Sequence, residues 1–255
     1  MIRPKNIVII GGGSGIGLAT AKKVLMDTSV KNVIIVSRSL EKLNCAKEHL
    51  NDNRVHVATI DISNVKSHRQ FMTGVNEMIN DCVDGVIISS GLDFDGSNCK
   101  GFNISEEDYD RLMNVNLKGV FFMIRNYANY MCENHIKGNI CVVSSISAHR
   151  DLLSVYQISK NAISGIVHAY GKFLCEKGIV LNCVEPGTTD GGMLKYLAAY
   201  TDGIREGKPW NDNSIRRVIR PEEIAEVISF LISEVGEVMS GTCLLAGGGC
   251  KSIAR

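Results

Sequence analysis

Short, wholly apolar runs alternate along this chain with longer stretches in which apolar residues recur every third or fourth position. The first run, Ile7–Ile10, contains only β-branched apolar residues, which is typical of a strand buried on both faces of a parallel sheet. In the next stretch, Leu18, Ala21 and Val24 are spaced as on one face of a helix. The pattern predicts a strand joined to a helix by a glycine-rich turn.

The same strand–helix unit recurs along the chain. Further strands are predicted at Val33–Val36, Arg54–Ile60, Val86–Ile88, Asn139–Val143, Ile179–Val184 and Thr242–Leu245. Further helices are predicted at Leu40–Leu50, Val65–Ile79, Ser105 to about Cys132, Ser154–Glu176 and from Pro221 onward. Such alternation predicts an α/β fold with a doubly wound, mostly parallel sheet, flanked by helices on both faces, that binds ligands at the carboxyl ends of its strands.

No linker, repeat or low-complexity segment interrupts the alternation, so we expect a single domain over residues 1–255. The long stretch without clear periodicity is Thr188–Arg220. Loops of this length in compact domains are usually functional lids or disordered segments. We expect a substrate lid at about 188–220, with a helical piece around Met193–Tyr200.

Composition excludes several classes of function. The net charge of +1 argues against nucleic acid or an anionic membrane as partner. No apolar run approaches the roughly 20 residues of a membrane span, and Met1 leads directly into the first strand without a signal peptide. The nine cysteines are scattered, with no C-x-x-C pair, which indicates reduced thiols and a cytoplasmic location. We expect no metal site, because the sequence shows no set of metal-binding side chains at the spacing that metal ligands require.

The turn after the first strand has the glycines needed for a close approach to a ligand. Gly11, Gly15 and Gly17 follow the spacing G-x-x-x-G-x-G, not the G-x-G-x-x-G of the common dinucleotide fingerprint, and no Gly-Lys-Ser/Thr follows as in a P-loop. A strand that turns onto a helix N-terminus presents free N–H groups and a positive dipole end, which favour a phosphate. The alternative is a tight structural turn.

Tyr156 and Lys160 lie four positions apart near the start of a predicted helix, so their side chains share one face. A neighbouring cation stabilises phenolate and should lower the tyrosine pKa from about 10. Tyr156 is therefore a candidate proton donor and acceptor near neutral pH. The alternative is an ordinary surface pair.

Three other features accompany this pair. Ser144 and Ser145 directly follow the fifth predicted strand, at the edge where such sheets bind ligands. Asn116 lies inside a predicted helix, where asparagine is unfavourable, so it is kept for its side chain or for a local kink. Pro186-Gly187 ends the sixth strand.

Taken together, these elements resemble the short-chain dehydrogenase/reductase family, from about Lys5 to Gly249. The resemblance implies a Rossmann-like fold and NAD(P)(H)-dependent oxidation of alcohols or reduction of carbonyls. It implies that Tyr156 exchanges a proton with the substrate oxygen, that Lys160 lowers the Tyr156 pKa and binds the nicotinamide ribose, and that Ser145 bonds the substrate oxygen. Asn116 would hold a water that links Lys160 to solvent.

The resemblance also implies a set of cofactor contacts along the strand ends. They are Gly11, Ser14, Gly15, Ile16, Gly17, Ser37, Arg38, Asp61, Ile62, Ser90, Gly91, Tyr156, Lys160, Pro186, Gly187, Thr188 and Thr189.

Some positions depart from the family pattern. Ile10 replaces a threonine that would brace the glycine loop, and Ser89-Ser90 replaces part of an Asn-Asn-Ala-Gly segment. Gly191 stands where the family has a threonine after Pro-Gly. The segment between Ser145 and Tyr156 is about two residues shorter than usual, which leaves Ser144 as a rival for the catalytic hydroxyl.

The second strand is followed by Ser37-Arg38-Ser39, with no carboxylate to accept from the adenosine ribose hydroxyls. A guanidinium there suits the 2′-phosphate of NADP(H), which we expect to be preferred, with NAD(H) possible as a weaker cofactor. The glycine loop offers no second basic residue. Alternatively, Arg38 is a surface residue that stacks on adenine. Asp61 with Ile62 resembles the family's adenine-binding pair.

We expect a small-molecule carbonyl or alcohol substrate to bind between Tyr156, the Ser145–Leu153 segment, Leu92–Phe102 and Thr188–Trp210. The resemblance implies a homodimer or homotetramer packed through the helices at Ser105–Cys132 and Ser154–Glu176. The rival functions are an NAD-preferring alcohol or hydroxysteroid dehydrogenase and a non-catalytic dinucleotide-binding sensor.

Overall fold

The computed structural model of the protein describes residues 3–92, 103–150, 154–191 and 213–250. They contain a seven-stranded sheet with the strand order β3-β2-β1-β4-β5-β6-β7, in which neighbouring strands are parallel. The strands are β1 (Asn6–Ile10), β2 (Asn32–Ser37), β3 (Val55–Thr59), β4 (Gly85–Ile88), β5 (Gly138–Val143), β6 (Ile179–Pro186) and β7 (Cys243–Ala246). The expectation of a doubly wound parallel sheet is confirmed.

The strand order reverses beside β1, which pairs with β2 on one side and β4 on the other. Ile10 is in register with both Val36 and Ile88, so the three strands end level. The loops after them therefore start side by side: Ser89 N donates to the Ile10 carbonyl at 2.8 Å, and Gly11 N donates to the Val36 carbonyl at 2.7 Å. In doubly wound sheets such a reversal opens the crevice where ligands bind.

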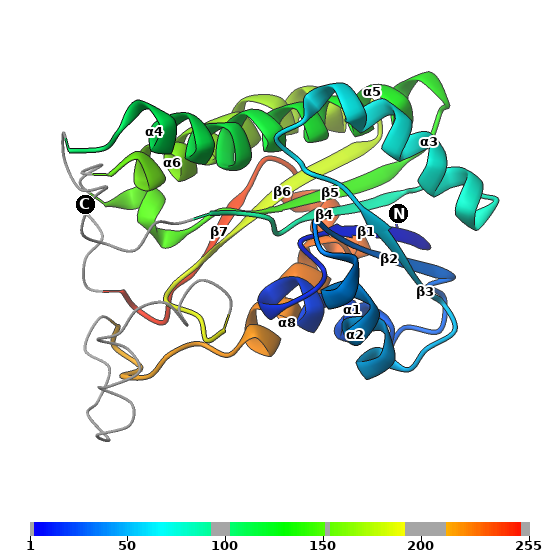
Figure 1. Cartoon of the computed structure of the whole chain (residues 1–255), viewed down its shortest axis with the longest axis horizontal. Helices are drawn as coiled ribbons and strands as arrows, with labels where there is room; N and C mark the ends of the chain where they lie inside the picture. The colour runs from blue at the N-terminus through cyan, green and yellow to red at the C-terminus, as the bar shows by residue number, and fades with distance from the viewer. Residues whose placement is uncertain (1–2, 93–102, 151–153, 192–212, 251–255) are drawn as a thin grey trace.

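Helices cover both faces of the sheet (Figure 1). Below it in this view lie α1 (Gly15–Val24), α2 (Leu40–Leu50) and α8 (Pro221–Leu231), and above it lie α3 (His68–Ile79), α4 (Glu106–Met113), α5 (Val120–Glu133) and α6 (Val155–Cys175). Short helical segments occur at η1 (Val65–Ser67), η3 (Ile146–His149) and η5 (Glu234–Met239). In the described ranges, no helix has both the length and the apolar character that crossing a lipid bilayer requires.

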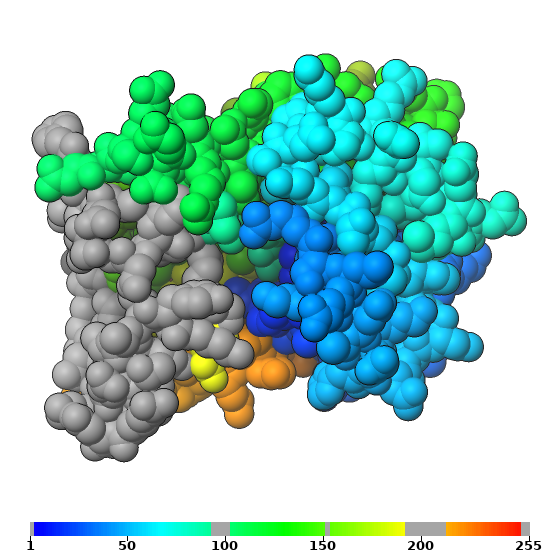
Figure 2. All heavy atoms as spheres, viewed as in Figure 1, coloured from blue at the N-terminus to red at the C-terminus, as the bar shows by residue number. Residues whose placement is uncertain are grey.

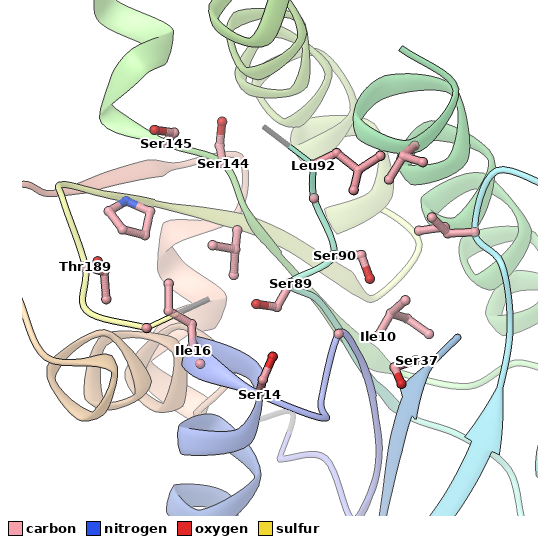
Figure 3. Close-up of a pocket in the computed structure, with 18 of the residues that line it drawn as sticks. Ile10, Ser14, Ile16, Ser37, Ser89, Ser90, Leu92, Ser144, Ser145 and Thr189 are labelled. Carbon is pink, nitrogen blue, oxygen red and sulfur yellow. The ribbon is translucent and has the colours of Figure 1, made fainter. Parts of the chain in front are cut away.

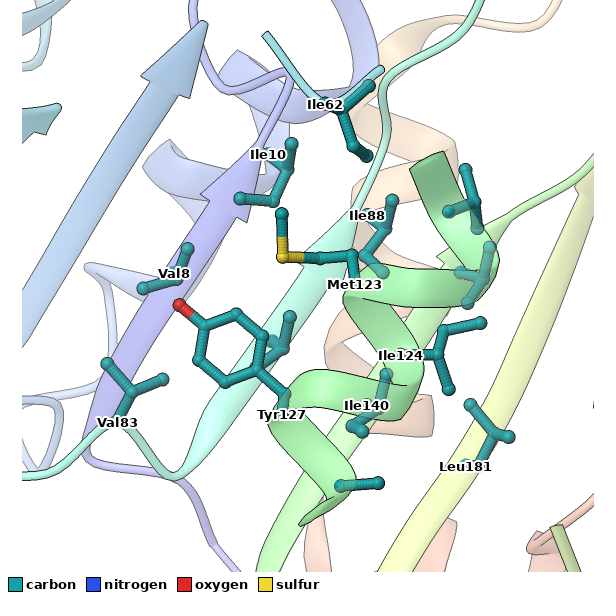
Figure 4. Close-up of a cluster of buried hydrophobic side chains, with 14 of the residues drawn as sticks. Val8, Ile10, Ile62, Val83, Ile88, Met123, Ile124, Tyr127, Ile140 and Leu181 are labelled. Atoms are coloured by element: carbon teal, nitrogen blue, oxygen red, sulfur yellow. The ribbon is translucent and has the colours of Figure 1, made fainter. Parts of the chain in front are cut away.

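The central strands send alternate side chains into two cores. Val8 and Ile10 of β1 join the core on the α5 side, where they lie near Tyr127 (Figure 4). Ile7 and Ile9 join the opposite core, towards α1 and α8. Burial on both faces explains the uninterrupted apolar run of this strand, because burying one such side chain is worth about 1.5–3 kcal/mol.

The helix predicted from Ser105 to about Cys132 is present without a break from Glu106 to Glu133, but its middle is not α-helical. α4 and α5 are separated by η2 (Asn114–Gly119), a π-helical turn. Gly119 permits a close contact there, because a Cβ on it would lie 2.5 Å from the Ile62 carbonyl oxygen. Asparagine and glycine both disfavour a regular helix interior, and π-turns within helices are often found at functional positions.

Several predicted features lie wholly or partly outside the described residues. The helical piece around Met193–Tyr200 does so, as does most of the lid expected at about 188–220. Most of Leu92–Phe102 and the end of Ser145–Leu153, both expected to border the substrate, do so as well.

Tyr127 carries an unfavourably placed polar group in the core of Figure 4. Its side chain is fully buried, and its hydroxyl has no hydrogen-bond partner among the described residues. Burial accordingly raises the pKa of this phenol. A buried hydroxyl without a partner costs about 1–3 kcal/mol.

We therefore expect Tyr127→Phe to raise the free energy of unfolding by about 1 kcal/mol, because it removes the hydroxyl and keeps the ring. Denaturant unfolding of the two proteins measures the change. Tyr109→Phe is the matched control, since Tyr109 is 42% exposed and its substitution should change stability by less than about 0.5 kcal/mol. A loss of stability in Tyr127→Phe would show that the hydroxyl has a partner in solution.

Candidate active site

The carboxyl ends of β1, β2, β4, β5 and β6 border a cavity of about 800 Å³. The surface is hollowed between the blue residues near the N-terminus and the green residues above them (Figure 2). The described wall consists of Ile10, Gly11, Ser14, Gly15, Ile16, Ser37, Arg38, Ser39, Lys42, Ile60, Asp61, Ile62, Ser89, Ser90, Gly91, Leu92, Val115, Val143, Ser144, Ser145, Tyr156, Lys160, Pro186, Gly187, Thr189, Asp190 and Gly191.

The glycine loop turns β1 onto α1 at one side of this cavity. Gly11 has φ +92°, and a Cβ on it would lie 2.8 Å from the Ser89 carbonyl carbon. A Cβ on Gly17 would lie 2.2 Å from the Gly11 carbonyl oxygen, so the first turn of α1 packs directly on the loop. Ile10 cannot brace the loop with its side chain, and main-chain bonds to β2 do so instead. The free N–H groups and positive dipole end of α1 fit a phosphate.

Serine and basic side chains gather at the end of β2. Ser37, Arg38 and Ser39 line the cavity, and so does Lys42 from the first turn of α2. Lys42 is a second basic group that the sequence analysis missed, because it comes from a helix and not from the glycine loop. The sequence feature that could have revealed Lys42 is Ser39, a residue type that often caps helices. Its hydroxyl caps α2 and accepts from Lys42 N at 3.3 Å. This cap brings the first turn of α2 back to the end of the strand.

Asp61 is the acidic side chain at the same end of the wall. Its Oδ1 accepts from the Ser63 hydroxyl at 2.6 Å and from Ser63 N at 2.9 Å. The hydroxyl bond, the backbone bond and the charge of Arg38 together hold the pKa of this carboxyl below its ordinary value. Asp61 is therefore ionised at neutral pH.

Tyr156 and Lys160 reach the cavity from the first turns of α6. Ser154 and Gln157 form a reciprocal capping box that sets where this helix begins. Lys160 is only 4% exposed, and its Nζ donates to the Val143 carbonyl at 3.1 Å. The same Nζ lies 5.6 Å from the centroid of the Tyr156 ring. A cation held at this position favours the phenolate form of the tyrosine.

Asn116 of η2 lies behind this pair and is buried. Leu92 N donates to its Oδ1 and its Nδ2 donates to the Leu92 carbonyl, both at 2.7 Å. Its Nδ2 also lies 3.4 Å from Ser159 Oγ on α6. Gly91 is close to both groups, since a Cβ on it would lie 3.5 Å from Lys160 Nζ and 3.7 Å from Asn116 Oδ1. The π-turn thus ties the loop after β4 to α6.

The two serines after β5 have different surroundings (Figure 3). Ser144 is buried, and its hydroxyl donates to the Lys160 carbonyl at 3.0 Å, towards α6. Ser145 is only partly buried, and its oxygen accepts from Ser147 N at 3.1 Å. Because that bond uses an oxygen lone pair, the Ser145 hydroxyl proton is available to a group in the cavity. The geometry favours Ser145 over Ser144 as the ligand-contacting hydroxyl.

Most of the expected contacts are brought together in the described wall, but Gly17, Asn116 and Thr188 are not part of it. Gly17 and Asn116 lie behind the wall, against residues that form it. Thr189 does line the cavity, and its hydroxyl donates to the Gly187 carbonyl at 2.9 Å.

Some residues of the cavity wall were not among the expected contacts, and most of them are sequence neighbours of an expected residue. They are Ile10, Ser39, Lys42, Ile60, Ser89, Leu92, Val115, Val143, Ser144, Asp190 and Gly191. Lys42 and Val115 differ from the others because helices carry them to the cavity.

A protein-family model and individual relatives point to the same family of proteins. A protein-family model described as short chain dehydrogenase matches residues 5–201. The chain is 29% identical over 257 residues to the L-rhamnose 1-dehydrogenase (NADP(+)) of Thermoplasma acidophilum, covering 96% of this chain and 95% of that protein. It is 28% identical to dehydrogenase/reductase SDR family member 2, mitochondrial, of Homo sapiens, covering 94% and 84%.

The fold is also found in solved structures. A short chain dehydrogenase from Bacillus anthracis has a TM-score of 0.82 to this chain at 22% identity, covering 96% of this chain and 95% of that one. At that identity, the likeness concerns the fold.

We expect Gly17→Ala to lower the free energy of unfolding by about 1–3 kcal/mol, because the added Cβ forces α1 away from the Gly11 carbonyl. Gly74→Ala on α3 is the matched control, since a Cβ there meets nothing within 4 Å. That change should stabilise the protein by about 0.5–1 kcal/mol. Denaturant unfolding measures both, and equal stability of Gly17→Ala and wild type would refute the close packing of α1 on the loop.

Proposed function

The chain belongs to the short-chain dehydrogenase/reductase family, and on that premise we propose that it transfers a hydride between NADP(H) and a carbonyl or secondary alcohol, with Tyr156 as general acid and base. The observation that carries the proposal is one cavity bordered by the glycine loop before α1, by the Tyr156–Lys160 pair and by Ser145. A dinucleotide fits this arrangement, because its phosphates meet the N-terminus of α1 at the reversal of strand order.

The nicotinamide, when bound, supplies or accepts the hydride. Tyr156 donates its hydroxyl proton to the carbonyl oxygen in reduction and accepts a proton from the alcohol in oxidation. The Lys160 ammonium, 5.6 Å from the Tyr156 ring centroid, favours the deprotonated phenol. Because Lys160 is buried and held by the Val143 carbonyl, its charge stays in place and is poorly screened by water.

Ser145 donates a hydrogen bond from its hydroxyl to the substrate oxygen, which orients that oxygen for proton transfer with Tyr156. Ser144 has a different task, because its hydroxyl is directed to the Lys160 carbonyl. Asn116 holds Leu92 and Ser159 at a fixed separation. In this proposal Asn116 also binds the water through which Lys160 exchanges protons with solvent.

NADP(H) is the preferred cofactor in this proposal, because the end of β2 carries positive charge and no carboxylate. Arg38 and Lys42 both border the cavity there, beside the hydroxyls of Ser37 and Ser39. Charge-assisted bonds from these groups suit a 2′-phosphate. The relative from Thermoplasma acidophilum is named as an NADP(+) enzyme, which supports the same preference.

The substrate in this proposal is a small carbonyl compound or secondary alcohol, and sugars are the first class to test, given the name of the same relative. The enzyme acts as a homodimer or homotetramer, since α4 and α6 leave large apolar side chains exposed, at Tyr109, Ile158, Tyr170 and Phe173. Cys45, Cys82, Cys132, Cys141, Cys175, Cys183 and Cys243 are free thiols, which supports the cytoplasm as the compartment in this proposal.

We expect Tyr156→Phe to lower kcat by about 10²- to 10⁴-fold, because it removes the proton donor. The affinity for NADPH should change little, since the ring remains. The change in NADPH absorbance with a panel of sugars, ketones and steroids measures turnover: it rises when sugars or other alcohols are oxidised with NADP⁺ and falls when ketones are reduced with NADPH. Fluorescence titration measures NADPH binding.

Tyr130→Phe is the matched control for this substitution. The Tyr130 hydroxyl bonds to Cys82 Sγ at 3.1 Å, away from the cavity, so the variant should turn over as wild type does. Unchanged turnover in Tyr156→Phe would rule out the assigned acid/base role.

We expect Arg38→Asp to shift the NADPH-to-NADH ratio of kcat/KM towards NADH by about 10-fold or more, because a carboxylate repels the 2′-phosphate and accepts from ribose hydroxyls. Lys42→Gln should shift the ratio in the same direction by less. Lys47→Gln, also on α2 but outside the wall, is the control. The same ratio in Arg38→Asp and wild type would refute the phosphate pocket.

A further inference from the structure

A carboxylate lies buried directly behind the cavity, and the mechanism above does not use it. Glu185 is the penultimate residue of β6 and is only 1% exposed. Pro186 and Gly187, which follow it, line the cavity, whereas Glu185 itself is not part of the wall. A buried charge is costly unless it is paired and hydrogen-bonded. The partners of Glu185 therefore indicate what it does.

Both oxygens of this carboxylate have short contacts. Oε1 accepts from the Ser164 hydroxyl at 2.6 Å, and Oε2 lies 2.6 Å from His149 Nε2. At this distance His149 Nε2–H can donate to the Glu185 carboxylate, which offers only acceptor oxygens when it is ionised. The His149 side chain is 39% exposed. The pair thus connects the buried end of β6 to a segment near the surface.

Two thiols lie beside the carboxylate, but neither replaces His149 or Ser164 as a partner of Glu185. Cys183 Sγ, Cys243 Sγ and a Glu185 oxygen all lie within 4.8 Å of one another. Burial holds the pKa of the Cys183 thiol well above its ordinary value, so it is neutral. Cys243 Sγ donates to the Ser164 carbonyl at 3.6 Å. His149 supplies the basic side chain that contacts Glu185.

Glu185 joins the two elements that carry the reacting groups. Ser164 lies on α6, one turn beyond Lys160, and also lies 3.1 Å from the Lys160 carbonyl. His149 is the last residue of η3, and Ser145 is the N-cap of that segment. One carboxylate on β6 therefore holds α6 near Lys160 and holds η3 near Ser145.

The direction of the Ser145 hydroxyl depends on η3. Ser147 N donates to Ser145 Oγ at 3.1 Å, and Ala148 N donates to the Ser145 carbonyl at 3.0 Å. The second of these is a main-chain bond of the η3 turn, and the first directs the Ser145 side chain towards the same turn. His149 anchors the end of that single turn to β6 through Glu185, while Asn161 Nδ2 on α6 donates to the Ala148 carbonyl at 2.9 Å. The contact with Glu185 is thus the link of this turn to the sheet.

We propose that Glu185 and His149 are positioning residues for the reaction: the carboxylate holds His149, His149 keeps η3 wound, and η3 directs the Ser145 hydroxyl at the substrate oxygen. This inference rests on the proposed function, since it assigns its effect to turnover through Ser145. A displacement of about 1 Å in a reacting group can cost 10²-fold in rate.

We expect His149→Ala to lower kcat by about 10- to 100-fold while the Kd for NADPH stays within about twofold of wild type. His149 is partly exposed, so the change spares the core. In a Ser145→Ala background the same substitution should lower kcat no further, because it acts through Ser145. Independent, multiplicative losses in the double variant would overturn the inference. His49→Ala, exposed on α2, is the control and should match wild type.

Two further variants distinguish a positioning role of His149 and Glu185 from a contribution to stability alone. His149→Gln keeps a donor for Glu185 and should recover most of kcat. Adding Glu185→Gln to His149→Ala removes the buried carboxylate that has lost its His149 partner and should raise the Tm, yet kcat should stay low because η3 still lacks its link to β6. Recovery of kcat together with Tm would assign the pair a purely structural role and overturn the proposal.

Failure of the proposed function and failure of this inference give different results. If wild type turns over no compound on the panel, the proposed function fails while the anchoring of η3 can still be measured. Amide hydrogen exchange at Ala148 and Arg150, whose N–H groups bond back to Ser145 and Ser147, should be faster in His149→Ala than in wild type. Equal exchange rates would overturn the inference even in an active enzyme.

Discussion

The register of the parallel strands is the constraint on which the rest of this structure depends. Ile10 of β1 is level with Val36 and Ile88, and Ile88 is in turn level with Val142 of β5. The loops after these strands therefore begin at one edge, and residues from distant parts of the chain meet in one cavity. A slip of one residue in any strand would exchange its two faces. Burial of both faces makes such a slip costly.

Two buried charges lie near the cavity and are held in different ways. Lys160 donates to a main-chain carbonyl and stays close to the Tyr156 ring. Glu185 contacts His149 and accepts a hydrogen bond from the hydroxyl of Ser164. Fixed charges and dipoles in a site with little water stabilise a reaction because they need no reorganisation during it. The same low dielectric makes each unpaired charge costly, which explains why both are bonded.

Much of the fold was predictable, because the signals are local. The apolar runs and their helical neighbours predicted the order of strands and helices, and Ser105 and Ser154 predicted helix starts that the structure confirms. The helix through Asn116 was predicted as well, but not its π-helical turn at Asn114–Gly119. A helical apolar period does not reveal a π-turn, which depends on Gly119 meeting the Ile62 carbonyl of a distant loop. Rules of local propensity are most often broken near functional sites.

For the candidate site the sequence by itself determined the glycine turn, the shared helix face of Tyr156 and Lys160, and the place of the serines after β5. Each of these depends on residues a few positions apart, through turn chemistry or helical spacing. Only the tertiary structure decided which hydrogen bonds the Ser144 and Ser145 hydroxyls make, that Lys42 reaches the end of β2, and that Glu185 contacts His149. These features depend on which side chains from distant parts of the chain come into contact, and no local sequence pattern encodes those contacts.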